Sequence, residues 1–363
     1  MTALPPTILS ALKAGDVKSF ATIPATGESG LKVEQIVTAR RCGFFNPQNA
    51  EERNFVMLSK EELYKRIEDA LGNAYPQYEF TQRECEKNNQ TIDVLIVRDV
   101  KSPVAPSLNL TDWYERYSDG DVSVEDVITH LVAIIEDAFT GVDTEALADA
   151  AKEAVKNWKK SARFSVVKKE GNERYLAGKA TTDFLDLVKE YYVPVEIAGG
   201  VGRVVITEDI FRDFGCTIEE LDEIALKNTI VQDAPVWTPI EEVLREMIAQ
   251  ELHLPIELIP VEAFQVGFPM YVVTTTSQHL GAGMMLYSSV LEAVLDDMNA
   301  KEMWIAPSST HEIICVPVNC GITLDGISEI VSTVNREALP AQEILSGSVY
   351  RFAHGDNAVS IAA

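Results

Sequence analysis

Positive charge is scarce in this sequence, and it is scarcest towards the C-terminus. The 363 residues include 31 lysines and arginines against 56 aspartates and glutamates, which gives a formal net charge of −25. Residues 251–363 hold 13 acidic residues and only three cations, Lys301, Arg336 and Arg351. Such a surface repels phosphates, so we expect no direct binding of DNA or RNA. It would attract a basic protein, although solubility alone also explains the charge.

Long apolar runs and paired cysteines are missing as well. No stretch approaches the roughly 18 apolar residues of a membrane span, and the first residues lack the basic and apolar segments of a signal peptide. An odd number of scattered cysteines is typical of reduced thiols. We therefore expect a cytoplasmic protein without membrane contact. The cysteines are Cys42, Cys85, Cys216, Cys315 and Cys320.

The motifs of common enzyme classes are absent too. Neither the P-loop pattern G-x-x-x-x-G-K-[ST] nor the hydrolase pattern G-x-S-x-G occurs. Gly199, Gly200 and Gly202 connect two predicted strands, which indicates a hairpin turn and not a dinucleotide-binding loop. Pairs of glutamates stand at predicted helix starts, where they favour the helix dipole. We therefore predict no cofactor and no catalytic residue, and the sequence argues against an enzyme without excluding one.

His311, Glu312 and Cys315 come closest to a metal-binding pattern. They read H-E-x-x-C, one residue away from the H-E-x-x-H of zinc hydrolases. That chemistry needs both ligands on one face of a helix, whereas the isoleucines and valine between Pro307 and Pro317 predict a strand. On a strand, positions 311 and 315 lie about 13 Å apart, too far for one metal ion to bridge. We predict no metal site.

A binding loop is the alternative interpretation of the same region. A turn is predicted at the two serines, followed by the start of a strand. Functional groups favour loops that a rigid scaffold positions. The candidate binding residues are Ser308, Ser309, His311 and Glu312.

Two other sets of side chains are candidates for binding a partner. Trp113, Tyr114 and Tyr117 cluster on a predicted helical turn, where such aromatics are either core residues or interface hot spots. Asp296 and Asp297 end a predicted helix in the acidic C-terminal third. We expect most carboxylates of that third to be exposed, because desolvation of an unpaired carboxylate is costly. Several of them would then form one negative patch.

Helices and hairpins are intermixed along the chain. Ser59 with Glu62 and Thr217 with Glu220 match the capping box, which predicts a helix start at each. Turns are predicted at residues 88–89 and 199–200. This mixture predicts an α+β fold, with largely antiparallel sheets and flanking helices. Other expected elements are a helix at 147–158, strands at 270–275, 302–306, 312–318 and 348–352, a turn and strand at 281–287, a helix capped by Ser289 and Glu292, and a helix at 326–337.

The pattern predicts two lobes and an N-terminal extension. Residues 1–58 mix prolines and glycines with short apolar stretches, as an extension does. Residues 59–160 form the expected N-terminal α+β domain, which ends in two amphipathic helices. Residues 161–363 form the expected C-terminal α+β domain.

Several blocks of sequence resemble a bacterial family without known activity. They are LDLVKEYYVPV, GRVVIT, CTIEELDEIALKNT, MYVVTTT, WIAPSSTHEIICVPV and AQEILSGSVYRF, preceded by KNNQTIDVLIVRD and APSLNLTDWYERYSDGD. In this serial order they resemble the domain-of-unknown-function family 5688, which is distantly similar to the YtpQ proteins. The resemblance covers roughly residues 61–353. It implies a fold arrangement and a bacterial or mobile-element source, and it implies no activity.

Three hypotheses about function remain open. The first is a cytosolic, non-enzymatic acidic protein that binds or regulates a partner, which the charge suggests to be a basic protein. The second is an acidic decoy or inhibitor from a mobile element, which occupies the nucleic-acid-binding surface of its partner. The third is an enzyme whose site is assembled from residues far apart in the sequence. A charge-driven decoy should lose its partner steeply as salt rises.

Overall fold

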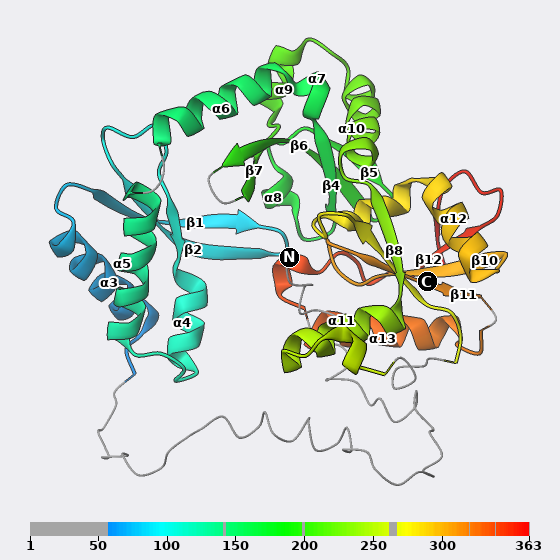
Figure 1. Cartoon of the computed structure of the whole chain (residues 1–363). Coiled ribbons are helices and arrows are strands. Elements are labelled where there is room, and N and C mark those ends of the chain that lie inside the picture. The colour runs from blue at the N-terminus through cyan, green and yellow to red at the C-terminus, as the bar shows by residue number, and fades with distance from the viewer. Residues whose placement is uncertain are drawn as a thin grey trace, which may run out of the picture.

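The structure is a computed structural model that describes residues 57–140, 143–197, 200–260, 267–318, 320–337 and 339–362. Two hydrophobic cores divide these residues into an N-terminal lobe, residues 57–140, and a C-terminal lobe, residues 158–362 (Figure 1). The predicted extension lies outside the described residues, except for its last two. The division of the chain into domains at residues 58 and 160 stays a prediction.

The N-terminal lobe packs helices against a small antiparallel sheet. Its first helix begins where predicted: Ser59 caps it, and Ser59 and Glu62 form the reciprocal hydrogen bonds of a capping box. Leu63, Ile67 and Leu71 line one face of this helix and are fully buried. The elements are α3 (Lys60–Ala74), β1 (Glu79–Lys87), β2 (Gln90–Arg98), β3 (Ser107–Asn109), α4 (Leu110–Ser118) and α5 (Val124–Thr140).

Two helices carry the chain from one lobe to the other. The single helix expected at 147–158 is wrong, because the structure has α6 (Thr144–Lys156) and α7 (Trp158–Ser161). Asn157 separates them: its side chain donates to the backbone oxygen of Glu153, and such local bonds compete with helix continuation. The break lets Trp158 turn into the core of the C-terminal lobe, where it stacks on Phe214. Figure 1 shows α6 running along the top from lobe to lobe.

The C-terminal lobe contains two antiparallel sheets. In the first, β6 (Leu187–Ile197) is central, with β4 (Arg163–Lys168) on one side and β5 (Thr181–Phe184) and β7 (Gly200–Val205) on the other. The second has the order β13-β12-β10-β11-β9-β8. Its strands are β8 (Pro235–Pro239), β9 (Tyr271–Thr275), β10 (Glu302–Pro307), β11 (Ile313–Pro317), β12 (Tyr350–Ala353) and β13 (Ser360–Ile361).

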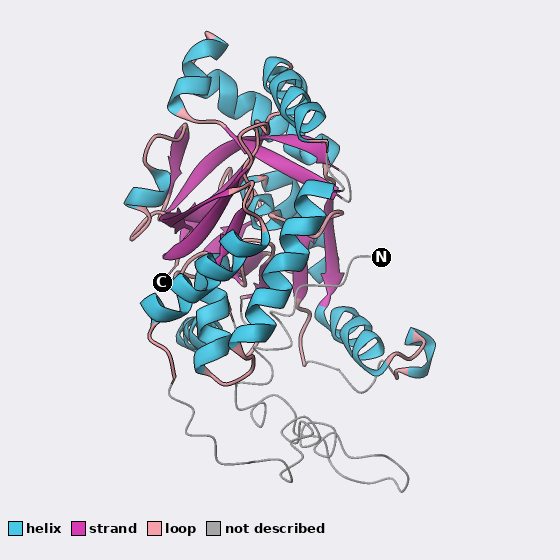
Figure 2. Cartoon of the chain, turned by 90° about the vertical axis from the view of Figure 1, so that its left-hand side faces the viewer, coloured by secondary structure: helices cyan, strands magenta, loops and turns pink. Residues whose placement is uncertain are grey.

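Helices cover both sheets of the C-terminal lobe, as the turned view in Figure 2 shows. They are α8 (Glu173–Leu176), α9 (Glu208–Phe214), α10 (Ile218–Gln232), α11 (Ile240–Leu252), α12 (Ser288–Met298) and α13 (Leu324–Glu337), with the 3-10 helices η3 (Ile256–Leu258), η5 (Gly281–Leu286) and η6 (Ala341–Glu343). The capping box of Thr217 and Glu220 is present at α10. All described strand pairs are antiparallel, so the predicted α+β class is confirmed.

Residue parity decides what each face of the six-stranded sheet contacts. Val273, Ile313 and Cys315 are odd-numbered residues that enter the large core shared with the first sheet. Even-numbered residues such as Val272 and Val316 pack instead in smaller clusters with α11 and α13. Neighbouring side chains of a strand point to opposite faces, so adjacent residues here serve different environments.

Two local predictions in the last third are wrong. Residues 281–287 do not form a strand, because Gly281 to Met285 are all buried in a 3-10 turn, and burial on all sides hides the period that separates strand from helix. The cap expected from Ser289 and Glu292 does not form. Glu292 instead accepts a hydrogen bond from the backbone N–H of Gly355 and pairs with His354.

The tip of the β1–β2 hairpin joins the two lobes. Asn88 donates to the backbone oxygen of Gln342 at 2.8 Å, and Asn89 donates to that of Ile344 at 2.7 Å. Asn172, which is 1% exposed, donates to the side-chain oxygens of both asparagines. Asn89 has a φ of 60°, a backbone state that asparagine tolerates better than most residues. The predicted hairpin turn is thus confirmed, and it is also an interlobe contact.

Candidate functional site

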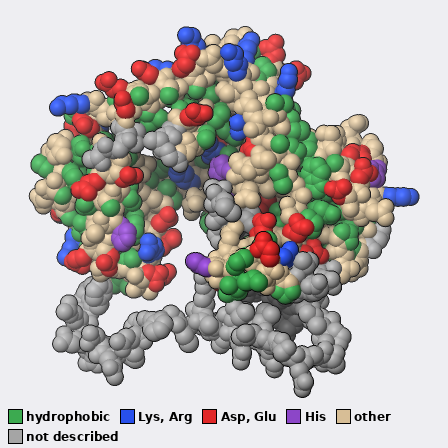
Figure 3. Space-filling view, viewed as in Figure 1, with side chains coloured by type: hydrophobic (Ala, Val, Ile, Leu, Met, Phe, Trp, Pro, Cys, Tyr) green, Lys and Arg blue, Asp and Glu red, His purple; other side chains and the backbone are tan. Residues whose placement is uncertain are grey.

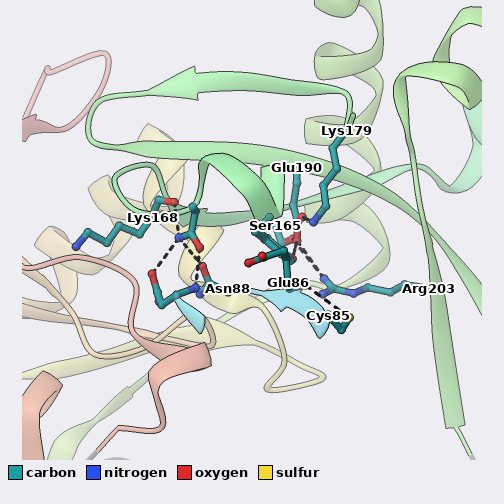
Figure 4. A network of polar contacts seen from close by, with 11 residues as sticks. Cys85, Glu86, Asn88, Ser165, Lys168, Lys179, Glu190 and Arg203 are labelled. Carbon is teal, nitrogen blue, oxygen red and sulfur yellow. Dashed lines mark hydrogen bonds and ion pairs between the residues drawn. The ribbon is translucent and has the colours of Figure 1, made fainter. Parts of the chain in front are cut away.

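One face of the four-stranded sheet is polar although it is largely covered. On β6, Tyr191 and Val193 point into the main core, so Glu190 and Tyr192 point the other way. We call this second side the interlobe face, because β1 and the hairpin tip lie next to it (Figure 4). It carries Arg163, Ser165, Glu190, Tyr192 and Arg203.

Glu190 is the centre of this face and is only 2% exposed. One of its oxygens accepts hydrogen bonds from Ser165 at 3.1 Å and Tyr175 at 3.0 Å. The other accepts from the ammonium of Lys179 at 2.7 Å. Arg203 lies 3.6 Å from the carboxylate, and Figure 4 shows both Arg203 and Lys179 reaching towards Glu190. A buried carboxylate needs such partners, because desolvation of a lone charge is expensive.

The surroundings of Glu190 change the protonation of its neighbours. Burial lowers the pKa of Lys179, although the carboxylate of Glu190 acts against this. Burial and the same carboxylate raise the pKa of Tyr175. Tyr175 therefore stays a neutral donor, and its ring lies 3.2 Å from the Lys179 ammonium. Residues from four separate elements thus meet here, as the hypothesis of a site assembled from distant residues requires.

A loop from β9 to η5, residues 276–280, passes beside this face. Gln278 and Leu280 both have a φ of 55°, which is uncommon for residues other than glycine. The carboxylate of Asp233 fixes the start of the loop. It accepts hydrogen bonds from the hydroxyls of Thr276, at 2.8 Å, and Ser277, at 2.5 Å. At its end, a Cβ on Gly281 would come within 2.6 Å of the backbone oxygen of His311. Strained backbone that is fixed from both ends is a feature of functional sites.

His279 of this loop lies against His311. The ring centroids are 4.9 Å apart, and the Nδ1 atom of His311 accepts a hydrogen bond from the backbone N–H of Leu280 at 3.1 Å. The remaining proton of a neutral His311 is therefore on Nε2. Burial, His279 and Arg203 lower the pKa of His311 to about 4, and burial and Arg203 lower that of His279. Both rings are neutral at pH 7, and the charge of Arg203 is near both.

Glu312 points away from His311 and lines a pocket of about 180 Å³, which we call the Glu312 pocket. The Glu312 side chain is 2% exposed, and Ser308 donates a hydrogen bond to it at 3.3 Å. The pocket combines two carboxylates, four threonines and an amide with an apolar side. The lining residues are Val236, Thr238, Val243, Glu246, Val272, Thr274, Thr275, Thr276, Gln278 and Glu312.

The predicted binding loop is therefore divided between two places. Ser308 reaches the Glu312 pocket through its hydrogen bond, whereas His311 joins His279 near the interlobe face. Ser309 is fully buried and is not among the residues that line the pocket. Its hydroxyl accepts a hydrogen bond from the backbone N–H of His311 at 3.0 Å. A role of these residues in binding stays a prediction.

The aromatic cluster of the N-terminal lobe is partly core and partly surface. Tyr117 is 2% exposed, and its hydroxyl accepts from the backbone N–H of Leu58. Tyr114 is half-buried and packs edge-on against Tyr64. Trp113, also half-buried, lies between Arg116 and His130.

Acidic residues of the C-terminal third differ in their exposure. Of the 12 that the structure describes, six are exposed, five are half-buried and Glu312 is buried. Asp296 and Asp297 are both exposed, but Asp297 accepts a hydrogen bond from Trp237 at 2.6 Å and Asp296 lies 3.6 Å from His354. Half of the described carboxylates are thus exposed, and Glu262 lies outside the described residues, so the expectation that most of the 13 are exposed stays a prediction.

The strand predicted at 312–318 is confirmed as β11. His311 precedes the strand and Cys315 lies inside it, 0% exposed, where burial raises the pKa of its thiol. Within the described residues, no three histidine, cysteine or acidic side chains are grouped so that they could hold a metal ion. No helix of this part of the chain is long and apolar enough to cross a membrane.

Sequence reasoning missed Glu190, Arg203, His279 and the threonines of the pocket. One usable signal was the pair Lys189-Glu190 inside an otherwise apolar strand, since charges at the middle of a strand are rarely buried without partners. Another was the polar run from Thr274 to His279 directly after a buried strand. Arg203 had no such signal, because its importance depends on which strand lies beside β6.

The fold and the two sites define a two-lobed α+β protein with antiparallel sheets and a polar interlobe face. Residues 56–354 match the family of unknown function DUF5688, so the chain belongs to this family. No curated protein and no solved structure matches the chain. The distant similarity to the YtpQ proteins stays an expectation.

Proposed function

We propose that this protein is a non-enzymatic acidic binding protein, and that the Glu312 pocket receives an ammonium group of a basic partner. The observation that carries the proposal is the buried carboxylate of Glu312 at the wall of a pocket that Glu246 and four threonines also line. An ammonium has three donors, and Glu312, Glu246 and the threonine hydroxyls offer acceptors for them.

The apolar side of the pocket fits the rest of a lysine side chain. Val236, Val243 and Val272 line it, and two of them neighbour threonines across the strands, Val236 beside Thr274 and Val272 beside Thr238. Lysine buries its methylene stem against such surface while its head group binds polar atoms. The net charge of −25 would bring a basic partner to the surface, and the pocket would then hold one of its side chains.

Binding of a labelled oligolysine peptide by the purified protein tests the proposal. Glu312→Gln keeps the shape and the hydrogen bond from Ser308 but removes the charge, so we expect affinity to fall about tenfold or more. Glu329→Gln removes the same charge from an exposed position on α13 and should change affinity less than twofold. Equal losses in both variants would show that only the overall charge acts.

A decoy from a mobile element is the narrower form of this proposal. Its partner would be a nucleic-acid-binding protein whose basic surface the acidic protein occupies. Duplex DNA should then compete with this protein for such a partner, and the competition should weaken as salt rises. A partner that binds DNA and this protein simultaneously would exclude the decoy.

We also propose that the protein acts in the cytoplasm of a bacterium. The four cysteines that the structure describes, Cys85, Cys216, Cys315 and Cys320, are free thiols, which suits a reducing compartment. Fractionation of the native host and detection of the protein with an antibody test this location.

A further inference from the structure

Arg203 is a surplus cation on the interlobe face. Glu190 has a strong partner in Lys179, at 2.7 Å, which already balances its charge. Arg203 lies farther away, at 3.6 Å from Glu190, and its hydrogen bond to Ser165 is long at 3.5 Å. Its side chain is 37% exposed, so Arg203 is only partly covered. An arginine has five N–H donors, and the contacts of Arg203 with Glu190, Ser165 and Tyr175 do not use all of them.

A surplus cation of this kind is unusual in a protein with a net charge of −25. Arg163 lies on the same face and is near Asp233, at 4.0 Å. The Nε atom of Arg163 is buried without a hydrogen-bond partner. Arg163, Lys179 and Arg203 outnumber the carboxylates of Glu190 and Asp233 by one, and the nearby carboxylate of Glu86 is paired with Arg174 at 3.6 Å. The interlobe face is therefore locally positive although the molecule as a whole is acidic.

Neutral donors stand next to Arg203. The Nδ1 atom of His311 is occupied by the backbone N–H of Leu280, so the Nε2–H group is the one left to donate. Tyr192 lies under the guanidinium, 5.7 Å from ring centroid to Cζ. In Figure 3, histidine and Lys/Arg side chains are visible at the wall of a hollow between the two lobes.

We propose that Arg203, His279 and His311 form a binding site for an oxyanion, a carboxylate or a phosphate, beside the interlobe face. A guanidinium matches the two oxygens of such a group with parallel N–H donors, and an imidazole N–H adds a third bond without adding charge. The strained loop from β9 to η5 fixes His279 in place before the ligand arrives, which lowers the entropy lost on binding. The site differs from the Glu312 pocket, but the loop that carries His279 also lines that pocket through Thr276 and Gln278.

The test measures binding of inorganic phosphate and of acetate to the full chain by isothermal titration calorimetry. Arg203→Gln should weaken the preferred anion at least tenfold, and Arg203→Lys should weaken it less, since it keeps the charge but not the paired donors. Arg212→Gln is the matched control: it removes an exposed arginine on α9 that pairs with Asp209 at 3.1 Å. Phosphate preferred over acetate indicates a phosphorylated ligand, and the reverse order a carboxylate.

A second measurement keeps the proposal falsifiable if a variant folds poorly. Histidine ring resonances of the unaltered protein should shift on addition of the anion for two of the five histidines, and the pKa of those two should rise towards its ordinary value, because a bound anion favours the charged ring. The groups that face His311 are His279 and Arg203. Non-saturable binding, equal losses in Arg203→Gln and Arg212→Gln, or unshifted histidines would overturn the proposal.

Discussion

The two faces of β6 hold two buried ion pairs with different surroundings. On the core face, Lys189 donates to both oxygens of Asp222, at 2.5 and 2.6 Å, and Tyr191 donates to the same carboxylate at 2.7 Å. On the interlobe face, Glu190 pairs with Lys179 and has Arg203 as an additional cation. The core pair is therefore balanced, and the interlobe pair is not.

This difference teaches how to separate a structural pair from a candidate site. In the core pair, the charges of Lys189 and Asp222 balance each other, and the Tyr191 hydroxyl donates a further hydrogen bond to the carboxylate. Such a pair needs no ligand. An excess charge beside a strained loop and accessible donors leaves capacity for a ligand. Substitutions on the core face should change stability alone, whereas those on the interlobe face should also change anion binding.

The largest effect is expected from Asp222→Ala on the core face. Lys189 has a side chain that is only 9% exposed, and it would lose its anion. Removal of one partner from a buried pair typically costs about 3–5 kcal/mol, and partial exposure of Asp222 places the expected loss near the lower end, about 3 kcal/mol. Urea denaturation measures this loss. The affinity of the folded variant for phosphate should not change. A tenfold change would contradict the idea that the core face affects stability alone.

Gly281→Ala and Gly283→Ala compare the end of the loop at residues 276–280 with the core of the C-terminal lobe. A Cβ at Gly281 would meet the Thr274 Oγ1 at 2.4 Å and backbone oxygen of His311 at 2.6 Å, so the strand itself would have to move. At Gly283 it would meet only the ring of Phe164, at 2.9 Å, and a ring can tilt. We expect a cost of about 3 kcal/mol for Gly281→Ala and about 1 kcal/mol for Gly283→Ala.

Thermal unfolding of the two glycine variants tests this order. Gly281→Ala should in addition weaken anion binding, because it displaces the loop that carries His279. A larger loss of stability in Gly283→Ala would mean that the core tolerates less movement than the loop.

The free energy of unfolding should decrease as pH is lowered, because of His311 near the interlobe face. The pKa of His311 is about 4 in the folded protein, below the ordinary value of 6.5 that applies to the unfolded chain. The unfolded chain therefore binds more protons between these values, so the contribution of neutral His311 is complete above about pH 6.5 and is lost as pH falls towards 4. We expect a loss of about 2 kcal/mol over this range, allowing for partial exposure.

Denaturation curves from pH 7 to pH 4 measure this loss. His311→Gln removes the titrating group, so its stability should depend less on pH by the same amount. A parallel pH dependence in both proteins would assign the effect to other groups.

The smallest effect is expected from Thr217→Ala. Thr217 caps α10, the helix that carries Asp222, and its hydroxyl accepts from the backbone N–H of Glu220 at 3.3 Å. Loss of such a cap typically costs about 1 kcal/mol. Calorimetric unfolding should show this cost with no change in anion affinity, as expected for a change on the core side.

Local signals in the sequence determined the elements that depend on neighbours in the chain. Hydroxyl and carboxylate side chains three residues apart fixed the starts of α3 and α10, and an Asn-Asn pair fixed the β1–β2 hairpin. Alternation of apolar residues fixed most strands, and with them the α+β class. The acidic composition and the absence of enzyme motifs were likewise properties of the sequence alone.

Only the tertiary structure decided where the polar residues meet. The turn before β11 places His311 against His279 and Glu312 in the pocket, and pairing of β7 with β6 brings Arg203 to Glu190. These contacts join residues far apart in the chain, and no local preference encodes a distance between them. Burial on all sides likewise turned residues 281–286 into a 3-10 helix, since tertiary packing overrides local pattern where every face is covered.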